Sequence, residues 1–391
     1  MSKLVEHREG ATRLLVPRAS LSKDPPPKVP VFFNPAASLN RDVSVALASA
    51  SGARTFCDSM AGVGARGVRI ANEVGKVQHV ALVDLNPSAI RVARRAAALN
   101  GVGGECEFSC SDTSAYLSAK GGRDERFECV DVDPFGTPVR QVQAALTATS
   151  DGGVLSVTAT DTAVLCGVYP KVSLRRYGAL PLNNHFHHET GVRILVGYVA
   201  RQGASLDLGV TPVAAHSTRH YVRVYLRVKV GASEADSTLG RLGHVGWCHV
   251  CGRAWRAGGH ERECPGCGGR AKIAGPLWDG RLTDEAVLRA GVRAASATGL
   301  DLAKRTLSSL VGVDEFPPWS FSIERMCSAL KVATVPASVV VERLQDSGRK
   351  AMRTPFEKTG IKTDAGVEEM LTSVRQAAGG GAARPRGEPP A

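Results

Sequence analysis

Blocks of apolar residues separated by helical patterns run along residues 53–230 and predict a repeating strand–helix order. Strands are expected at residues 53–58, 79–84, 105–110, 130–133 and 153–161. One helix follows the glycines near residue 67, and another begins at Asn86-Pro87, an N-cap residue followed by proline at the first helical position. Strand–helix alternation with short connections predicts a doubly wound, Rossmann-like α/β sheet that is mostly parallel.

Two long β-rich runs, at residues 206–216 and 220–230, follow a helical pattern at residues 190–200. Only a tight turn near Ser217-Thr218-Arg219 separates them. Because so short a connection joins antiparallel neighbours, we expect these strands to form an antiparallel pair at one edge of the sheet.

The pattern changes after residue 230. Residues 231–236 are predicted to be a linker, residues 247–275 a cysteine-rich module, and residues 280–312 and 320–375 helical. The last stretch, residues 379–391 (GGGAARPRGEPPA), lacks the apolar residues that a core requires. We therefore predict a domain at 1–230 with an N-terminal extension, a smaller α+β domain at 231–378 and a disordered tail at 379–391.

The composition is that of a globular protein with an anionic partner. Of the 391 residues, 43% are hydrophobic and 22% charged, and Lys and Arg exceed Asp and Glu by 49 to 37, a net charge of +12. This excess favours nucleic acid. No run of 18 apolar residues occurs, and the first ten residues lack the apolar segment of a signal peptide. We expect a soluble, cytoplasmic protein with reduced thiols, and no obligate protein partner is evident.

A glycine loop, Gly62-x-Gly64-x-x-Gly67, follows the first strand and opens a helix. Glycine is needed where backbone approaches a ligand closely, and Asp84, at the end of the next strand, can bind ribose hydroxyls. Asp58 ends the first strand and Asp112 follows the third. The loop fits a nicotinamide or flavin cofactor as well as S-adenosylmethionine, but three acids and no hydride-transfer machinery favour the cationic sulfonium.

The stretch Val130-Asp131-Val132-Asp133-Pro134-Phe135-Gly136 ends the fourth strand at the same edge. Pro134 forces Asp133 into an extended conformation, so a carboxylate, a proline carbonyl and an aromatic ring are presented together. Alone, this tetrapeptide also fits an ordinary strand-to-turn exit with a core Phe. Beside the glycine loop, it resembles the Asp/Asn-Pro-Pro-Tyr/Phe motif of amino-methyltransferases, in which the carboxylate and carbonyl hold an exocyclic amine.

Further stretches resemble one family, the tRNA (guanine-26-N2)-dimethyltransferases of archaea and eukaryotes. They spread over residues 30–365 and comprise Phe33-Asn34-Pro35 with Asn40-Arg41-Asp42, Asp133-Pro134-Phe135-Gly136, Thr158-Ala159-Thr160-Asp161 with Leu165-Cys166-Gly167, Glu189-Thr190-Gly191-Val192-Arg193-Ile194-Leu195, and Thr359-Gly360-Ile361-Lys362-Thr363-Asp364. One departure is Pro355, where this family is expected to have His.

The resemblance implies a class I methyltransferase that binds S-adenosyl-L-methionine and tRNA. With the glycine loop and strand ends, the expected cofactor contacts are Arg41, Asp58, Gly62, Gly64, Arg66, Asp84, Asp112 and Thr113. Asp133 and Pro134 would hold the guanine amine, and Phe33 and Phe135 would stack on the base. The product would be N2-methylguanosine and then N2,N2-dimethylguanosine. A methyltransferase acting on adenine N6 and a noncatalytic zinc-bearing RNA-binding protein remain as alternatives.

Two Cys-x-x-Cys-Gly pairs, Cys248 with Cys251 and Cys264 with Cys267, have the spacing of a structural zinc site. A closed set of four thiolates predicts a structural role. His185, His187 and His188 fit a metal site or a catalytic base, but we expect them in a surface loop after Pro181, since the sequence supplies no clear further ligand. A basic stretch over residues 343–362 is either a solvated face or a phosphate contact, which the tRNA hypothesis favours.

Overall fold

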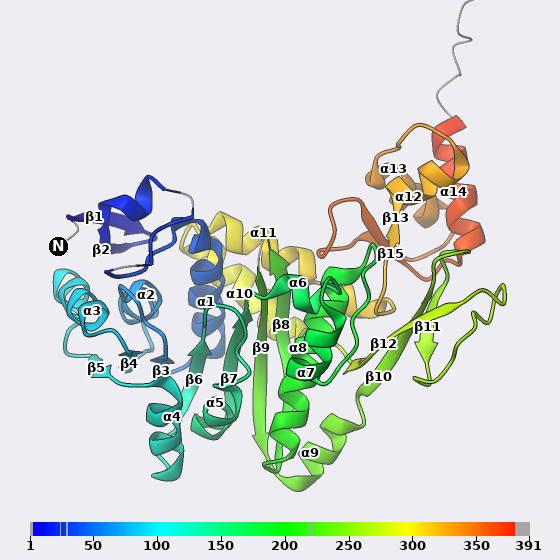
Figure 1. Ribbon diagram of the computed structural model, residues 1–391. Helices are drawn as coiled ribbons and strands as arrows, with labels where there is room; N and C mark the ends of the chain where they lie inside the picture. The colour runs from blue at the N-terminus through cyan, green and yellow to red at the C-terminus, as the bar shows by residue number, and fades with distance from the viewer. Residues whose placement is uncertain (1–2, 24, 29, 219–220, 380–391) are drawn as a thin grey trace, which may run out of the picture.

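A seven-stranded sheet organises the computed structural model, which describes residues 3–23, 25–28, 30–218 and 221–379 (Figure 1). The strand order is β5-β4-β3-β6-β7-β9-β8; the first five strands are parallel, and β9 is antiparallel to both β7 and β8. The bounds are β3 Thr55–Asp58, β4 His79–Asp84, β5 Cys106–Cys110, β6 Phe127–Val132, β7 Thr149–Ala159, β8 Leu208–Thr218 and β9 Tyr221–Val230. The predicted Rossmann-like sheet with its antiparallel edge pair is confirmed.

Helices cover both faces of this sheet (Figure 1). One face carries α1 Ser38–Ser51, α2 Ala65–Glu73, α3 Pro87–Leu99 and α10 Glu285–Ala297; the other carries α4 Thr113–Gly122, α5 Val142–Ala148 and α8 His187–Ala204. Two short helices, α6 Thr162–Leu165 and α7 Pro170–Tyr177, pack beside α8. The predicted start of α3 is confirmed, because the Asn86 side chain accepts a hydrogen bond from the Ser88 N–H and Pro87 is the first helical residue.

An N-terminal hairpin of β1 Leu4–Glu9 and β2 Thr12–Pro17 packs on α2 and α3. Leu14 and Val16 of this hairpin are completely buried in a small core beneath it. Short 3₁₀ helices at Arg18–Leu21 and Pro35–Ala37 lead to α1. The sequence predicted only a basic, proline-bearing extension here, because the exposed residues Glu6, Arg8 and Arg13 interrupt the apolar residues of the hairpin.

The linker predicted at residues 231–236 is wrong, since these residues begin helix α9, Ala232–Leu239. This helix packs on β8 and α8, and its Ala235 and Thr238 are buried. Helix α10 packs on α1 in turn, followed by α11 Asp301–Leu310 and a 3₁₀ turn at Val313–Glu315. After residue 230 the chain therefore continues to pack on the seven-stranded sheet and its helices.

Two three-stranded sheets complete the fold, and they make up a smaller α+β part as predicted. One has the order β11-β10-β12 and the other β13-β15-β14. Their elements are β10 Leu242–Cys248, β11 Ala254–Ala257, β12 Ala271–Trp278, β13 Phe321–Ser322, α12 Ile323–Leu330, α13 Ala337–Asp346, β14 Ala351–Arg353, β15 Gly360–Thr363 and α14 Val367–Gly379. The continuous helical pattern expected over residues 320–375 is wrong, because three short strands interrupt it.

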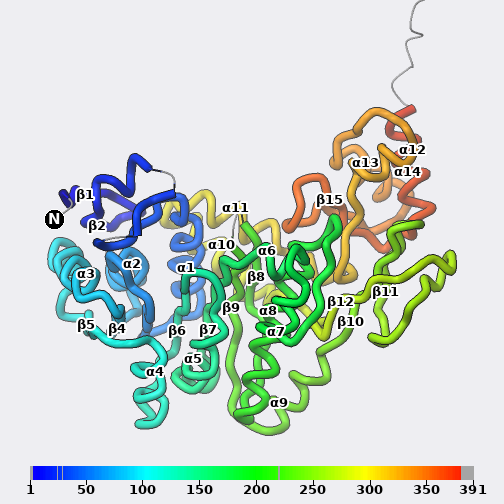
Figure 2. Tube along the Cα trace, viewed as in Figure 1, coloured from blue at the N-terminus to red at the C-terminus, as the bar shows by residue number. Residues whose placement is uncertain are grey.

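The hydrophobic cores divide the chain near residue 320. The main core draws on residues 43–313 with Phe356, and a separate core draws on residues 321–374. The expected boundary at residue 230 therefore does not coincide with the division between cores. Figure 2 shows the N-terminal hairpin and the C-terminal helices at opposite ends of the molecule. Apart from Gly379, the predicted tail lies outside the described residues.

Among the described helices, none is both long enough and apolar enough to cross a membrane.

Candidate active site

Acidic side chains lie at the carboxyl ends of the parallel strands. From β3 the chain passes to β4 and β5 on one side of β3, and it then crosses to β6 and β7 on the other side. Asp58 ends β3, Asp84 ends β4, and Asp133 follows β6. Pairing of β3 with both β4 and β6 holds these strand ends side by side. Ligands of doubly wound sheets bind at this switch point, so the sheet brings the predicted acids together at a typical ligand site.

The glycine loop between β3 and α2 is shaped around Asp84. Gly62 and Gly64 have φ angles of 55° and 80°, a left-handed conformation that favours glycine. One carboxylate oxygen of Asp84 accepts the Gly62 N–H at 2.8 Å, and the other accepts the Asn86 N–H at 2.8 Å. Each oxygen keeps a lone pair, so Asp84 both fixes the loop and remains able to accept from a ribose hydroxyl.

Asp58 lies beneath the loop and is only 2% exposed. Its carboxylate accepts the Gly67 N–H at 2.8 Å. Burial raises the pKa of Asp58 to about 7, and the nearby Arg66 guanidinium opposes this rise. The side chain therefore supports the loop from inside, and its predicted direct contact with a cofactor stays a prediction.

We expect the stability of this loop to depend on pH through Asp58. Because its folded pKa lies above its ordinary value of 3.8, its contribution is fully present below pH 3.8 and is lost as the pH rises through about 7. Asp58→Asn is uncharged at every pH, so between pH 5 and 7 the wild type should lose up to about 1.4 kcal/mol per pH unit relative to the variant. Urea unfolding of both proteins across this range checks the prediction, and parallel pH profiles would contradict it.

Asp112 and Thr113 lie where α4 begins, beyond the end of β5. Asp112 is exposed and caps the helix, one carboxylate oxygen accepting the Ala115 N–H at 3.0 Å. Thr113 is buried, and its hydroxyl donates to the Ser59 carbonyl at 2.6 Å. This bond ties the start of α4 to the end of β3, and it leaves the second oxygen of Asp112 free for a ligand.

Arg41 is a buried cation on α1. Its guanidinium donates to Glu9 of the N-terminal hairpin, with Nε 2.7 Å from Oε2, and to the Asn34 carbonyl at 3.0 Å. Sequence reasoning missed Glu9, because its contact spans 32 residues and its hairpin was not predicted. In the described conformation, a ligand carboxylate would share Arg41 with Glu9.

Arg66 of α2 joins the glycine loop to the Asp133 stretch. Its guanidinium forms an ion pair with Asp133 and a second one, at 3.2 Å, with Asp131. Asn40 and Ser44 of α1 accept its other N–H groups at 2.8 Å and 2.6 Å. Because Arg66 is only 6% exposed, this charge network fixes where the Asp133 carboxylate lies.

The loop that carries Asp133 is braced from β7. The Gly136 N–H donates to the Thr160 hydroxyl at 2.6 Å, and the Thr160 N–H donates to the Gly136 carbonyl at 2.8 Å. Gly136 has a φ angle of 81°, which favours glycine at this turn. The brace leaves the Asp133 side chain 28% exposed at the open edge of the site.

Phe135 is exposed on this loop, with 60% of its surface accessible. The Phe32 ring lies edge-on to it at 4.7 Å, and the Lys28 ammonium lies 4.7 Å from its centroid. Phe33 instead packs into the small N-terminal core, 2% exposed and 5.1 Å from the Arg41 guanidinium. Phe135 thus lies at the site, and the ring beside it is Phe32. Stacking of Phe33 on the base stays a prediction.

A further ion pair, between Asp131 and Arg223, underlies the site and was also missed. Both side chains are buried, and Arg223 of β9 donates as well to Thr158 at 2.5 Å and to Ser44 at 2.9 Å. The available signal was an arginine in the middle of an otherwise apolar strand, residues 221–226. Such a charge is buried only with partners, which identifies a structural network.

The four predicted cysteine ligands come together at the tip of the β10-β11 hairpin and the loop before β12. Cys248 Sγ lies 3.6 Å from Cys267 Sγ, and Cys251 Sγ lies 3.6 Å from Cys264 Sγ; all four lie within 4.8 Å of one another. Tetrahedral zinc with bonds of about 2.3 Å requires sulfur atoms about 3.8 Å apart. The four thiols therefore fit a zinc ion.

The three histidines do not form the surface loop that the sequence suggested. His187 and His188 open α8, with the Nδ1 of His188 3.7 Å from Cys166 Sγ and 3.3 Å from the Ser217 hydroxyl. His185 contacts the Ser320 carbonyl through Nε2 at 2.8 Å, and burial lowers its pKa to about 4. His185 and His188 thus join separate segments of the fold, whereas the Nδ1 of His187 contacts the nearby Asn184 carbonyl.

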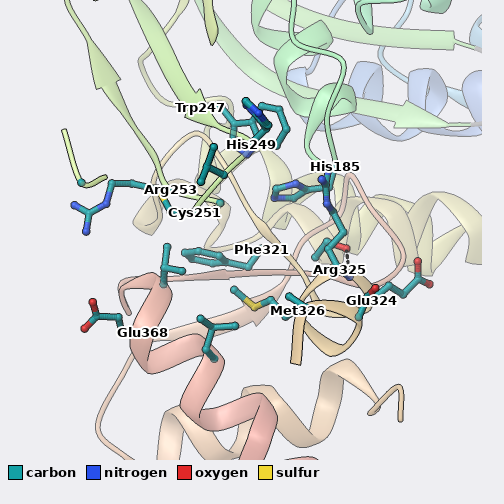
Figure 3. Close-up of a pocket in the computed structure, with 18 residues that line it drawn as sticks. His185, Trp247, His249, Cys251, Arg253, Phe321, Glu324, Arg325, Met326 and Glu368 are labelled. Atoms are coloured by element: carbon teal, nitrogen blue, oxygen red, sulfur yellow. Dashed lines mark hydrogen bonds between the residues drawn. The ribbon is translucent and has the colours of Figure 1, made fainter. Parts of the chain in front are cut away.

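A cavity of about 770 Å³ lies between the cysteine module and the C-terminal helices (Figure 3). Trp247, Phe321 and Met326 line it, and the Arg325 guanidinium lies 5.5 Å from the Trp247 ring. None of the strand-end acids lines this cavity, so it is separate from the candidate active site.

Known proteins resemble this chain along most of its length. Residues 10–375 match the family described as N2,N2-dimethylguanosine tRNA methyltransferase. A tRNA (guanine(26)-N(2))-dimethyltransferase of Methanopyrus kandleri is 37% identical over 380 residues, covering 95% of this chain and 96% of its own. Another, of Methanothermobacter thermautotrophicus, is 35% identical over 378 residues, covering 94% and 97%.

One solved structure shares the fold across nearly the whole chain. It is the complex of Trm1 from Pyrococcus horikoshii with S-adenosyl-L-methionine, which is 31% identical and has a TM-score of 0.82. The similarity covers 95% of this chain and 99% of that one.

Proposed function

The chain belongs to the N2,N2-dimethylguanosine tRNA methyltransferase family, and from this we propose how its residues act on the N2 amine of guanine 26 in tRNA. The enzyme transfers methyl groups from S-adenosylmethionine to that amine and produces N2-methylguanosine and then N2,N2-dimethylguanosine. The observation that carries the proposal is the position of Asp133, Pro134 and Phe135 at the end of β6, ion-paired to the glycine-loop helix through Arg66.

S-adenosylmethionine supplies an electrophilic methyl group on its sulfonium. The residues around the glycine loop fit it. Asp84 keeps lone pairs for the ribose hydroxyls, the exposed oxygen of Asp112 suits the adenine amine, and Gly62 and Gly64 let the backbone approach closely. Arg41 and Arg66 are the buried cations proposed for the methionine carboxylate, which would share them with their ion-pair partners Glu9 and Asp133.

Asp133 and Pro134 hold and activate the guanine amine. The amine lone pair is delocalised into the base, so hydrogen bonds to the Asp133 carboxylate and the Pro134 carbonyl favour a pyramidal, nucleophilic nitrogen. Holding this nitrogen in line with the methyl group supplies much of the remaining rate enhancement. No covalent enzyme intermediate is needed.

A guanine stacked within the tRNA must leave the stack to reach Asp133. The exposed Phe135 ring provides a surface for the flipped base, and base–aromatic stacking offsets part of the cost of unstacking. Phe32, which lies edge-on to Phe135, is a second candidate ring beside the predicted Phe33.

The structure sorts the basic stretch of residues 343–362 into available and compensated charges. Arg349 and Lys350 form ion pairs with Glu369 and Glu315, and Lys362 is completely buried. Arg353 and Lys358 are exposed without an ion pair among the described residues, and both line a cavity of about 800 Å³ beside the end of β8. We therefore assign phosphate contacts to Arg353 and Lys358.

Arg353→Ala/Lys358→Ala is expected to raise the KM for tRNA about tenfold with little change in kcat, because two phosphate contacts are lost. Steady-state methylation at fixed, saturating S-adenosylmethionine measures this. The matched control is Arg349→Ala/Lys350→Ala, which also removes two cations from the same stretch, but cations already paired with acids. Equal effects of the two double variants would contradict the assignment.

Zinc in the four-cysteine site is proposed as a structural ion. The full chain should contain about one zinc per molecule by elemental analysis, and Cys251→Ser/Cys264→Ser should contain none and melt at a lower temperature. Cys110→Ser, which changes an exposed thiol outside the cluster, should keep the metal. Retention of zinc by the double variant would contradict the site.

The base identity separates this function from the alternatives. Methyl transfer should be measured to two unmodified tRNA transcripts, one with guanine and one with adenine at position 26. Only the guanine transcript should accept methyl groups. Methylation of adenine would support an adenine N6 methyltransferase. Tight tRNA binding without any S-adenosylmethionine binding would support the noncatalytic RNA-binding protein. Action in the cytoplasm stays a prediction.

A further inference from the structure

The segment that follows β7 carries positive charge and no acidic residue. Residues 162–188 contain Lys171, Arg175 and Arg176 but no Asp or Glu. Arg176 forms an ion pair with Asp161 at 2.9 Å, whereas Lys171 and Arg175 are exposed and in no ion pair among the described residues. The segment therefore presents uncompensated positive charge.

Exposed apolar side chains accompany these cations. Val168, Tyr169 and Leu174 are 54%, 55% and 51% exposed. On α7, Lys171, Leu174 and Arg175 share one face, while Ser173 and Tyr177 are buried on the other. An exposed aromatic ring beside uncompensated cations is typical of a surface that stacks on bases and binds phosphates.

This surface is joined to the loop that carries Asp133. The buried Tyr177 hydroxyl lies 2.9 Å from the Thr137 hydroxyl and donates to Asp161 at 2.6 Å. Tyr177 ends α7, and eight residues of helix span about 12 Å. The exposed face of α7 is thus tied to the loop that carries Asp133.

We infer that Val168, Tyr169, Lys171, Leu174 and Arg175, the α7 surface, bind tRNA beside the target guanine. Lys171 and Arg175 contact backbone phosphates, and Tyr169 stacks on an unpaired or exposed base. The inference rests on the proposed function and adds a substrate surface outside the methyl-transfer site. A polyanion is favoured over a second copy of this chain, because self-association would bring the uncompensated cations of two copies together.

The test is the affinity of the full-length protein for a fluorescent, unmodified tRNA, measured by anisotropy at several salt concentrations. Lys171→Ala/Arg175→Ala should raise Kd about tenfold near 0.15 M salt and lower the slope of log Kd against log salt by about two. Tyr169→Ala should raise Kd about fivefold or more without changing that slope. The control, Lys76→Ala/Lys229→Ala, removes two exposed lysines near the amino ends of the parallel strands, Lys229 beside Asp151 of β7, and should behave as wild type.

Two results would overturn the inference. One is a Kd and slope for the α7 variants that equal those of the control. The other is a wild type that dimerises in sedimentation while Tyr169→Ala stays monomeric, which would make the surface a self-association face. Failure of the proposed function is distinguishable, because it would appear as absent methyl transfer by the wild type whatever the α7 variants bind.

Discussion

Asp133→Ala is expected to abolish detectable methyl transfer, a loss in kcat of about a thousandfold or more, while the Kd for S-adenosylmethionine changes less than about threefold. The carboxylate accepts a hydrogen bond from the reacting amine, and losing such a preorganised contact costs the transition state most. Cofactor affinity should persist because Arg66 keeps its contacts with Asp131, Asn40 and Ser44. Single-turnover methylation and calorimetric cofactor binding measure the two quantities separately.

Two control variants sharpen this prediction. Asp133→Asn keeps an amide oxygen that accepts hydrogen bonds, so it should retain more activity than the alanine variant. Glu128→Ala removes a carboxylate from the opposite end of the same strand, where it pairs with Arg54 at 3.0 Å, and should leave kcat unchanged. Equal losses of methyl transfer and cofactor binding in Asp133→Ala would contradict the role given to Asp133.

Glu189→Gln is expected to lower the free energy of unfolding by about 3–5 kcal/mol. Glu189 of α8 is 1% exposed and pairs with Arg193 at 2.9 Å and with Lys362 of β15 at 2.8 Å. The substitution leaves two buried cations without a counterion, which is far costlier than losing a surface pair. Because Glu189 contributes to the part built on the large sheet and Lys362 to the C-terminal part, this network also ties the two together.

The comparison that isolates the network uses a second substitution. Glu189→Gln/Lys362→Met also removes one of the two cations that lack a counterion, so the double variant should be more stable than Glu189→Gln alone. Burial already lowers the pKa of Lys362, so the single variant should also gain stability as the pH rises and this lysine loses its proton. Glu315→Gln, which breaks the exposed pair with Lys350, should cost less than about 1 kcal/mol. A similar small cost for Glu189→Gln would contradict the account.

The sequence pattern was sufficient to predict the large sheet and the strand ends that form the site. β4 spans the predicted residues, and Asp58, Asp84 and Asp133 stand at carboxyl ends because apolar runs stop there. The cysteine spacing likewise predicted the four-thiol cluster. These features depend on local periodicity and short spacings, which one sequence displays directly.

Other features depend on contacts between distant segments. Whether Phe32 or Phe33 faces Phe135 is decided by the N-terminal hairpin, whose core encloses Phe33. Helix α9 follows the strand β9 after Gly231, and its polar residues are typical of a linker. Its helical role depends on the packing of Ala235 in the contact of α9 with β8 and α8, which the sequence does not display. Glu9 and Arg223 reach the site across 32 and 92 residues, and no local pattern specifies their partners.

The most direct test of the central claim is methyl transfer from labelled S-adenosylmethionine to an unmodified tRNA, followed by nucleoside analysis and mapping of the label. Wild-type enzyme should place the label in N2-methylguanosine and N2,N2-dimethylguanosine at position 26, and Asp133→Ala should place none. Label in methyladenosine, or no transfer by folded, zinc-loaded protein, would contradict this claim.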